Sequence, residues 1–337
     1  MRKIIRAEPG YLVCYHLDKK KKIKISGKNM ELLKKWLKTG EKNELIIQLK
    51  DLGVINVGYL KEKKEYLKDM ITQCGETCAP LRSMTAPEIM NIELTTRCPL
   101  RCPQCYCDLN QGKDIKKETA FKYVDEAAQL KIPYINLSGG ETLVYPHLTE
   151  LIEFISSKGL DSAIAISGWG FDREKLQELK RAGLNEIYVS LNGSTKKTNS
   201  LSRDGYEKAI NALQILKADQ GINYHVNWVA RNDNVTDFPR LVRLARNYGV
   251  KGVCILASKP DATYILQESL SGEHFVFLAD YLKEFDDQEI SITVEPCYSP
   301  LKAYINNYYL FNHNIGFNKG CGAGRNGMAV DVDGNLT

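Results

Sequence analysis

Hydrophobic residues recur with two different periods along this chain, and the two patterns alternate from about residue 90 onward. Six segments alternate apolar and polar residues as strands do, and each precedes a segment with the period of a helix. The strands are expected at residues 91–98, 134–141, 162–168, 186–193, 224–232 and 252–257. The helices are expected at residues 117–130, 148–157, 173–182, 205–218, 238–248 and 273–283. Repeated strand–helix units predict an α/β domain over residues 90–296, with a parallel sheet and right-handed crossovers.

The first eighty residues follow another pattern and predict a separate domain with its linker, residues 1–80. Strands are expected at residues 11–17, 21–26 and 54–60, helices at 29–37 and 43–52, and a charged linker at 61–68. This order predicts a small winged helix-turn-helix-like domain. A winged helix can bind DNA, with Lys19 to Lys22 touching phosphates. The simpler interpretation of these lysines is a solvated turn between two strands.

The composition agrees with a globular, two-domain protein. The chain has 337 residues, of which 43% are hydrophobic and 26% are charged, and both shares are ordinary for globular domains. A net charge of +5 permits an acidic partner but does not require nucleic acid. Because the sequence contains no long apolar span and no signal peptide, we expect a cytoplasmic protein without membrane contact. Ten cysteines in such a protein point to metal binding or catalysis before disulfides.

Three of these cysteines stand close together directly after the first predicted strand of the main domain. Cys98, Cys102 and Cys105 have the spacing C-x3-C-x2-C. Three thiolates on one loop can hold three irons of a [4Fe–4S] cluster and leave the fourth iron open for another molecule. The alternatives are a zinc site with Cys107 as a fourth ligand, a redox-active C-x2-C pair, or unreactive thiols.

A second motif favours the iron–sulfur interpretation. Gly139, Gly140 and Glu141 follow the second predicted strand. Glycines let the backbone approach a ligand closely, and a carboxylate suits an ammonium group. With both motifs in this order, the chain resembles the radical S-adenosylmethionine (radical SAM) superfamily. The resemblance implies a partial (β/α)6 TIM-like barrel, with SAM bound to the open iron through its amino and carboxylate groups. It also implies a 5′-deoxyadenosyl radical that abstracts hydrogen, and an electron donor such as flavodoxin or ferredoxin.

The resemblance extends to four further residues expected to contact SAM. They are Ser190 and Asn192 after the fourth strand, Arg203 before the next helix, and Asn227 on the fifth strand. Each also has an ordinary structural interpretation, such as a turn, an exposed arginine or a buried and satisfied polar group. The chain departs from the family at two positions: Gln104 stands where an aromatic residue usually precedes the last cysteine, and Trp169 stands where a small polar residue is common.

The tail resembles the start of a SPASM or twitch-type extension, which holds auxiliary iron–sulfur clusters. Cys321 and Gly334 have the spacing of that motif, and the next cysteine of the motif would fall just past Thr337. We therefore expect Cys321 and Cys297 to be auxiliary ligands in a region spanning residues 297–337, and the chain to stop inside the motif. Cys74 and Cys78 form a further C-x3-C pair to which no role is assigned.

These resemblances together predict an enzyme that modifies a ribosomally made precursor peptide. The N-terminal domain would bind the leader of that peptide as an added edge strand, and not nucleic acid. A thioether crosslink from a cysteine is the first expected product. Carbon–carbon or carbon–oxygen crosslinking and epimerisation are alternatives. Two other functions stay open, a protein oxidase like the sulfatase-maturing enzymes and a winged-helix iron–sulfur regulator.

Overall fold

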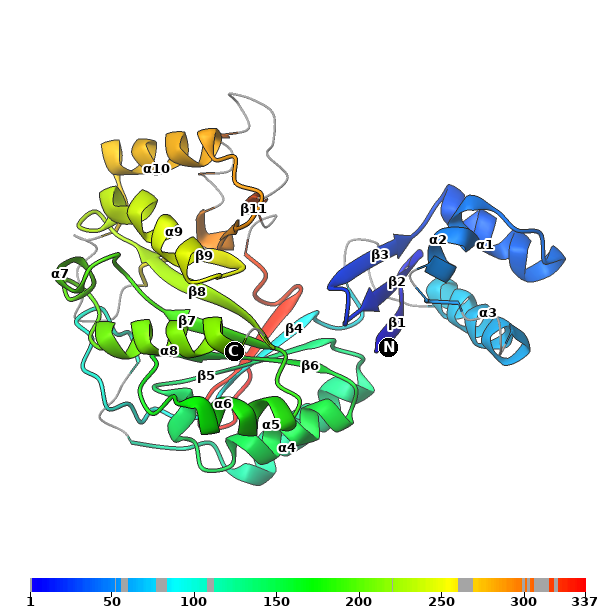
Figure 1. Cartoon of the computed structure of the whole chain (residues 1–337). Coiled ribbons are helices and arrows are strands. Elements are labelled where there is room, and N and C mark those ends of the chain that lie inside the picture. Colours follow the sequence, from blue (N-terminus) through cyan, green and yellow to red (C-terminus); the bar gives the residue numbers. More distant parts are fainter. Residues whose placement is uncertain are drawn as a thin grey trace.

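The main domain is a curved, all-parallel sheet with helices on its outer side (Figure 1). The computed structural model describes residues 2–51, 53–55, 60–76, 84–107, 112–219, 221–259, 269–298, 301, 304–305, 315–317 and 321–337. In this part the sheet has the strand order β11-β10-β9-β8-β7-β6-β5-β4-β12. Its strands are β4 Ile89–Glu93, β5 Tyr134–Ser138, β6 Asp161–Ile166, β7 Glu186–Ser190, β8 Asn223–Ala230, β9 Gly252–Ala257, β10 Ser291–Val294, β11 Ile315–Phe317 and β12 Gly327–Val330.

The six predicted strand–helix units are confirmed. The helices that follow β4 to β9 are α4 Lys117–Gln129, α5 Leu148–Ser157, α6 Arg173–Arg181, α8 Tyr206–Asp219, α9 Phe238–Asn247 and α10 Gly272–Glu284. The short helix α7, Lys196–Asn199, precedes α8. This right-handed succession of parallel strands is the expected partial barrel.

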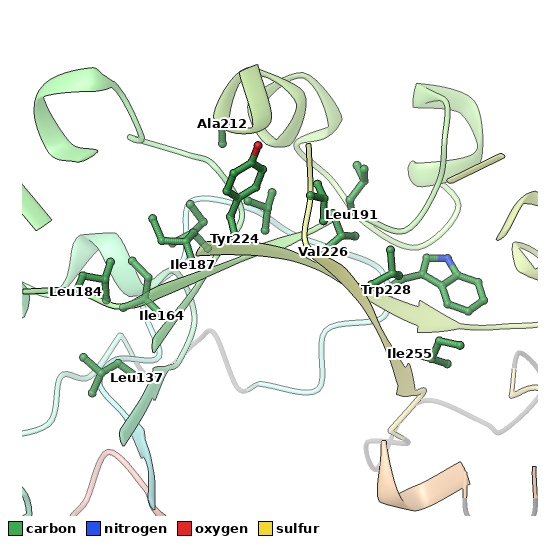
Figure 2. Close-up of a cluster of buried hydrophobic side chains, with 14 of the residues drawn as sticks. Leu137, Ile164, Leu184, Ile187, Leu191, Ala212, Tyr224, Val226, Trp228 and Ile255 are labelled. Atoms are coloured by element: carbon green, nitrogen blue, oxygen red, sulfur yellow. The ribbon is translucent and has the colours of Figure 1, made fainter. Parts of the chain in front are cut away.

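Hydrophobic alternation on the strands decides which side of the sheet the helices cover. On β8, Tyr224, Val226 and Trp228 are buried, whereas His225 and Asn227 between them are only half-buried. Figure 2 shows the first three among the buried side chains of neighbouring strands and of α8. The apolar side of the sheet therefore carries the helices, and the side chains between them line the other side, called here the inner face.

The sheet is wider than the six predicted units. β10 continues it beyond β9, and β11 pairs with β10. At the opposite end, β12 pairs in parallel with β4, in the register Met328 to Met90. An edge strand leaves a row of backbone groups unpaired, and β12 covers those of β4. The tail was expected to start an auxiliary domain; its strand β12 belongs to the main sheet instead.

The N-terminal part is a three-stranded antiparallel sheet with three helices. Its elements are β1 Lys3–Glu8, β2 Tyr11–His16, β3 Lys21–Ile25, α1 Lys28–Thr39, α2 Glu44–Asp51 and α3 Leu60–Glu76. The strand expected at residues 54–60 is wrong where the structure describes it. Val54 and Ile55 are buried bends, and α3 begins at Leu60; residues 56–59 lie outside the described residues. The charged segment 61–68 belongs to α3 and is not a linker.

The basic turn is not simply solvated, because two of its lysines contact the main domain. The Lys20 ammonium lies 2.5 Å from a carboxylate oxygen of Asp161 and 3.3 Å from one of Glu186. Lys22 pairs with Glu88. Arg2 joins the same group, since its guanidinium lies 2.7 Å from Asp161. These acidic residues stand at or near the amino-terminal ends of β4, β6 and β7, so the N-terminal domain docks at that end of the sheet.

A buried polar network strengthens this docking. Arg6 donates to Glu8 at 2.6 Å and to the carbonyl oxygen of Pro87 at 2.8 Å. The Tyr15 hydroxyl donates to Glu88 at 2.6 Å. Arg6, Glu8 and Tyr15 are each at most 3% exposed. Because buried charges are stable only when paired and hydrogen-bonded, this arrangement fixes the contact between the domains. None of the helices in the described part is long and apolar enough to cross a membrane.

Candidate functional site

The predicted cluster ligands lie on the loop that leaves the carboxyl end of β4, residues 94–107, called here the cysteine loop. Cys98, Cys102 and Cys105 are all free thiols and all partly exposed. The amide of Cys105 donates to the carbonyl oxygen of Cys102 at 3.0 Å, which closes a tight turn between them. Burial raises the pKa of Cys98, and the charges of Glu141, Cys102 and Cys105 raise it further. The three thiols are therefore near neighbours.

The glycine turn is joined to this loop through the backbone. The amide of Gly140 donates to the carbonyl oxygen of Thr95 at 2.6 Å, and that of Glu141 to Arg97 at 2.9 Å. A Cβ atom on Gly139 would lie 2.3 Å from the oxygen of Thr95, and one on Gly140 would lie 2.3 Å from the oxygen of Arg97. The φ of Gly139 is also +145°. The glycines are thus required by the close approach of the turn to the protein's own cysteine loop, immediately before Cys98.

Glu141 is buried and held by protein groups. Glu141 as a whole is 1% exposed. It accepts hydrogen bonds from the amide of Leu143 at 3.2 Å, from the amide of Ser167 at 2.8 Å and from the Ser167 hydroxyl. Burial raises the pKa of Glu141, and the bonds from Ser167 oppose that rise. The carboxylate therefore braces the end of β5 against the end of β6, and a contact with the SAM ammonium stays a prediction.

Two buried polar atoms beside the cysteine loop have no hydrogen-bond partner among the described residues. They are Nε of Arg203 and Oε1 of Gln104. The backbone amide of Gln104 donates to the carbonyl oxygen of Ser202 at 3.3 Å. The side chains of Gln104 and Arg203 therefore belong to one junction. Burial raises the pKa of Cys102, and the Arg203 charge opposes this. The charge of Arg203 also lowers the pKa of Glu141. A donor and an acceptor without partners at this junction are suited to a bound polar molecule.

The other residues expected to contact SAM differ in their access to the inner face. Ser190 and Asn227 are partners in the register of β7 and β8, and both are half-buried there. Asn192 is fully buried. Its side-chain amide donates to the Ser202 hydroxyl at 2.9 Å, and its side-chain oxygen accepts from the amide of Val229 at 3.2 Å. Asn192 thus braces the loop that carries Arg203, while Ser190 and Asn227 remain accessible.

The two tail cysteines lie near each other. Cys297 follows β10, and both Cys297 and Cys321 are exposed. Burial and the charge of Glu295 raise the pKa of Cys297, and the nearby Cys321 contributes to the same rise. Glu295 also pairs with Lys259, whose ammonium lies 5.7 Å from the centre of the Tyr106 ring on the cysteine loop. The tail cysteines therefore stand at the same end of the sheet as the cysteine loop.

The remaining cysteines are divided between the two domains. A hydrogen bond with Cys105, together with burial, raises the pKa of Cys107, whose sulfur is 4.0 Å from the Gly139 oxygen. Cys74 is buried and donates to the carbonyl oxygens of Tyr11 and Met70, each at 3.2 Å. Cys78 lies outside the described residues. Cys74 is therefore part of the N-terminal core and not of the site.

The donor set of the cysteine loop suits an iron–sulfur cluster. Cluster irons take cysteine thiolates, and this loop offers partly exposed thiols next to unpaired buried polar atoms. Among the described residues no three His, Cys, Asp or Glu side chains already converge as a metal site. The residue types therefore fit the group, without a preformed cage.

Sequence reasoning missed Ser167 as the partner of Glu141. Its position directly after β6, at the same end of the sheet as the glycine turn, was the available signal. Trp169, two residues later, is 41% exposed, so it is not packed in the core. Its amide donates to the Ser167 hydroxyl at 3.2 Å.

Comparison with known proteins identifies the main domain. The family model of the Radical SAM superfamily matches residues 92–257. The PqqA peptide cyclase of Ruegeria pomeroyi is 32% identical over 179 residues, which are 51% of this chain and 48% of that protein. The PqqA peptide cyclase of Gluconobacter oxydans is 32% identical over 170 residues, 48% of this chain and 47% of that protein. The chain spans about half the length of these relatives.

The fold agrees with this family. The crystal structure of Streptococcus suis SuiB covers 99% of this chain with a TM-score of 0.69 at 13% identity, and the match takes up 81% of SuiB. The same protein bound to S-adenosylmethionine matches with a TM-score of 0.66 at 12% identity, again over 99% of this chain and 81% of SuiB. At such identity the likeness shows the fold. Residues 92–257 therefore match the Radical SAM superfamily, and the chain shares the fold of SuiB.

Proposed function

We propose that this chain is a radical SAM enzyme that uses S-adenosylmethionine and a [4Fe–4S] cluster to modify a ribosomally made precursor peptide by hydrogen abstraction. The observation that carries the proposal is the direct backbone connection between the glycine turn and the cysteine loop, at the carboxyl ends of β5 and β4. Active sites on barrels of this kind are built at that end of the strands. A peptide substrate is supported by the relatives, which are named for cyclising the peptide PqqA.

Cys98, Cys102 and Cys105 are the proposed cluster ligands, and SAM would lie between the cysteine loop and the inner face. When bound, the cluster and SAM supply the hydrogen abstraction. Arg203 offers an unpaired Nε–H donor for a carboxylate. Ser190 and Asn227 offer polar groups on the accessible side of the sheet. Glu141 and the glycines would then act mainly by holding the cysteine loop in place.

The N-terminal domain is the proposed leader-binding element. β3 pairs with β2 on one side, and its other edge carries no strand within the part of the chain that the structure describes. An extended peptide can add to such an edge through main-chain hydrogen bonds. SuiB, which shares the fold, has been solved bound to its precursor peptide SuiA with a TM-score of 0.65 to this chain.

The proposed product is a crosslink within the peptide, with a cysteine thioether as the first candidate. The relatives are named as cyclases, and a new intramolecular bond is what a cyclase makes. Carbon–carbon or carbon–oxygen crosslinks are the next candidates, and epimerisation forms no bond. Cys297 and Cys321 are proposed to hold an auxiliary cluster, because they are exposed neighbours at the same end of the sheet.

The test begins with the cofactor chemistry alone. The full chain is reconstituted with iron and sulfide, reduced with dithionite and incubated with SAM, and 5′-deoxyadenosine is measured. The wild-type chain should form it, and the Cys98→Ala, Cys102→Ala and Cys105→Ala variants should not. Near-normal yield from one of these variants would remove that cysteine from the ligand set and point to Cys107. Absence of 5′-deoxyadenosine from the reconstituted wild type would favour a regulator over an enzyme.

The peptide test follows with the same protein. Short peptides encoded beside the gene are incubated with the active enzyme and analysed by mass spectrometry. A crosslink removes two hydrogen atoms, whereas epimerisation leaves the mass unchanged. A thioether also removes one cysteine from those that iodoacetamide can alkylate. Turnover of a folded sulfatase-type protein but of no short peptide would favour the oxidase alternative.

A further inference from the structure

The loop at residues 202–205, between α7 and α8, contacts several residues between the first and last cysteine of the motif. The carbonyl oxygen of Ser202 accepts from the amide of Gln104 at 3.3 Å. The carboxylate of Asp204 accepts from the amide of Arg101 at 3.0 Å. A Cβ on Gly205 would lie 3.1 Å from a methyl carbon of Leu100. Three successive contacts from one loop therefore define the path of residues 100–104.

Asp204 holds the middle cysteine from two directions. Its carboxylate binds the amide of Arg101, the residue directly before Cys102. The Asp204 backbone also lowers the pKa of Cys102, which burial raises. The carboxylate is an ionised acceptor, and such bonds are stronger than those between neutral groups.

The 202–205 loop is itself firmly held. Asn192, Asn199 and Ser202 are fully buried. The side chain of Asn199 donates to the carbonyl oxygen of Arg203 at 2.7 Å, and that of Asn192 donates to the Ser202 hydroxyl. The φ of Gly205 is +79°, which lets the chain turn into α8 directly after Asp204. A rigid loop can impose a conformation on a neighbour that packs less tightly.

We propose that Asp204 is a positioning residue that fixes the cysteine loop and the orientation of the Cys102 thiol. The inference rests on the proposed role of Cys102 as a cluster ligand, but it concerns the protein before the cluster is bound. Hydrogen bonds to ligand sulfurs and the order of the ligand loop both influence the potential of a bound cluster. Asp204 therefore prepares the loop for the cluster and then tunes the potential of the bound cluster through the Asp204 backbone.

The experiment compares Asp204→Ala with Asp204→Asn in the apo protein. Iodoacetamide alkylation of Cys102 is followed by peptide mapping, with exposed Cys321 as the internal reference. Asp204→Ala should alkylate Cys102 several-fold faster than the wild type, with Cys321 unchanged. Asp204→Asn keeps an acceptor oxygen and should restore part of the protection, while the carboxylate charge near Cys102 is absent from both variants. Equal rates in wild type and Asp204→Ala, or no rescue by Asp204→Asn, would overturn the proposal.

A second variant guards against a folding defect. Gly205→Ala would press on Leu100 and strain a left-handed backbone, so it should expose Cys102 without removing the carboxylate. Asp172→Ala is the matched control, because Asp172 also accepts a backbone amide, that of Lys175 at 2.7 Å, far from the cysteine loop in the chain. It should leave the alkylation of Cys102 unchanged. If Gly205→Ala also leaves it unchanged, the 202–205 loop does not position Cys102.

The reconstituted proteins separate this proposal from the proposed function. Asp204→Ala should bind less iron and shift the midpoint potential of the cluster to a more negative value, because a hydrogen bond to sulfur favours the reduced state. Faster alkylation in the apo protein combined with iron binding that survives Cys102→Ala would support the positioning role and contradict the ligand role. Unchanged alkylation combined with iron binding that depends on Cys102 would contradict the positioning role and support the ligand role.

Discussion

The carboxylate of Glu141 accepts hydrogen bonds from both the amide and the hydroxyl of Ser167. One residue ends the glycine turn after β5 and the other follows β6, so the bonds join two neighbouring loops at the proposed site. A buried carboxylate without such bonds would be costly, and burial already raises the pKa of Glu141. The pair therefore supports the turn that holds the cysteine loop.

Ser167→Ala should destabilise the protein by about 1–3 kcal/mol at neutral pH, because a buried charged acceptor loses one donor. The loss should shrink under acidic conditions. Burial raises the pKa of Glu141 and the Ser167 bonds lower it, so the variant penalises only the ionised form. Urea denaturation at neutral and acidic pH measures both effects. Ser157→Ala is the control, since the exposed Ser157 hydroxyl donates to the Phe154 carbonyl oxygen. A loss of stability in Ser167→Ala that does not depend on pH would contradict the ionised state of Glu141.

Gly140→Ala should weaken both stability and cluster binding. Its Cβ would lie 2.3 Å from the Arg97 oxygen, which is backbone and cannot move without shifting the cysteine loop. Overpacking of this kind costs about 1–3 kcal/mol. Gly75→Ala is the matched control, because no atom lies within 4 Å of the added carbon there. Thermal unfolding and iron content after reconstitution measure the two effects. Normal iron content in a destabilised Gly140→Ala would show that the turn and the loop are not coupled.

Glu88→Gln should weaken domain docking by about 1–2 kcal/mol at neutral pH. Burial raises the pKa of Glu88, but the bonds from Lys22 and Tyr15 and the charges of Lys22 and Arg6 outweigh it, and the pKa falls below its usual 4.5. A lowered carboxyl pKa stabilises the fold above the unfolded pKa, and this contribution disappears as the pH falls through the folded pKa.

The difference between wild type and Glu88→Gln should therefore vanish in acid, as measured by urea denaturation across the pH range. Glu31→Gln is the control, because Glu31 pairs with Lys34 on the surface with side chains 71% and 48% exposed. Such pairs contribute about 0–1 kcal/mol. If the effect of Glu88→Gln persists at pH values below the pKa range of carboxyl groups, packing and not charge causes it.

Leader binding by the full chain should depend only weakly on salt, and duplex DNA should bind poorly. Two lysines of the basic turn, Lys20 and Lys22, already pair with carboxylates of the main domain. Binding dominated by phosphates falls by roughly 10³-fold or more between 50 and 200 mM salt for about six contacts. Titrations with a candidate leader and with duplex DNA at both salt concentrations test this. Tight and strongly salt-dependent duplex binding without leader binding would overturn the peptide proposal.

Periodicity predicts the main domain well because its strands and helices bury regular faces. The helix expected at residues 148–157 and the strand at 252–257 have these bounds in the structure. The pairing of β12 with β4 was not predictable, because the sequence pattern around residues 327–330 does not indicate which distant strand they pair with. Tertiary contacts of this kind override local patterns.

The N-terminal domain was predicted less well because its polar residues are used inside the molecule. No strand was predicted from the sequence at β1, whose Arg6 and Glu8 are buried in the docking network. The sequence pattern predicts a strand at Val54 and Ile55, but both residues lie in a bend and pack into the core of the N-terminal domain. Among the site residues, Asn192 has a sequence context like that of a ligand contact, yet its partners lie on the 202–205 loop and on β8, and only the fold reveals them.

The pairing of β4 with β12 also sets an order of events during synthesis. The side chain of Asn91 on β4 donates to the carbonyl oxygen of Met328, 237 positions later in the sequence. Contacts between such distant segments form late, because a long loop must close first. The strand that leads into the cysteine loop therefore gains its second neighbour only after the ribosome has made residue 330. A cluster that requires this strand in its final setting would be inserted only after residue 330 has been made.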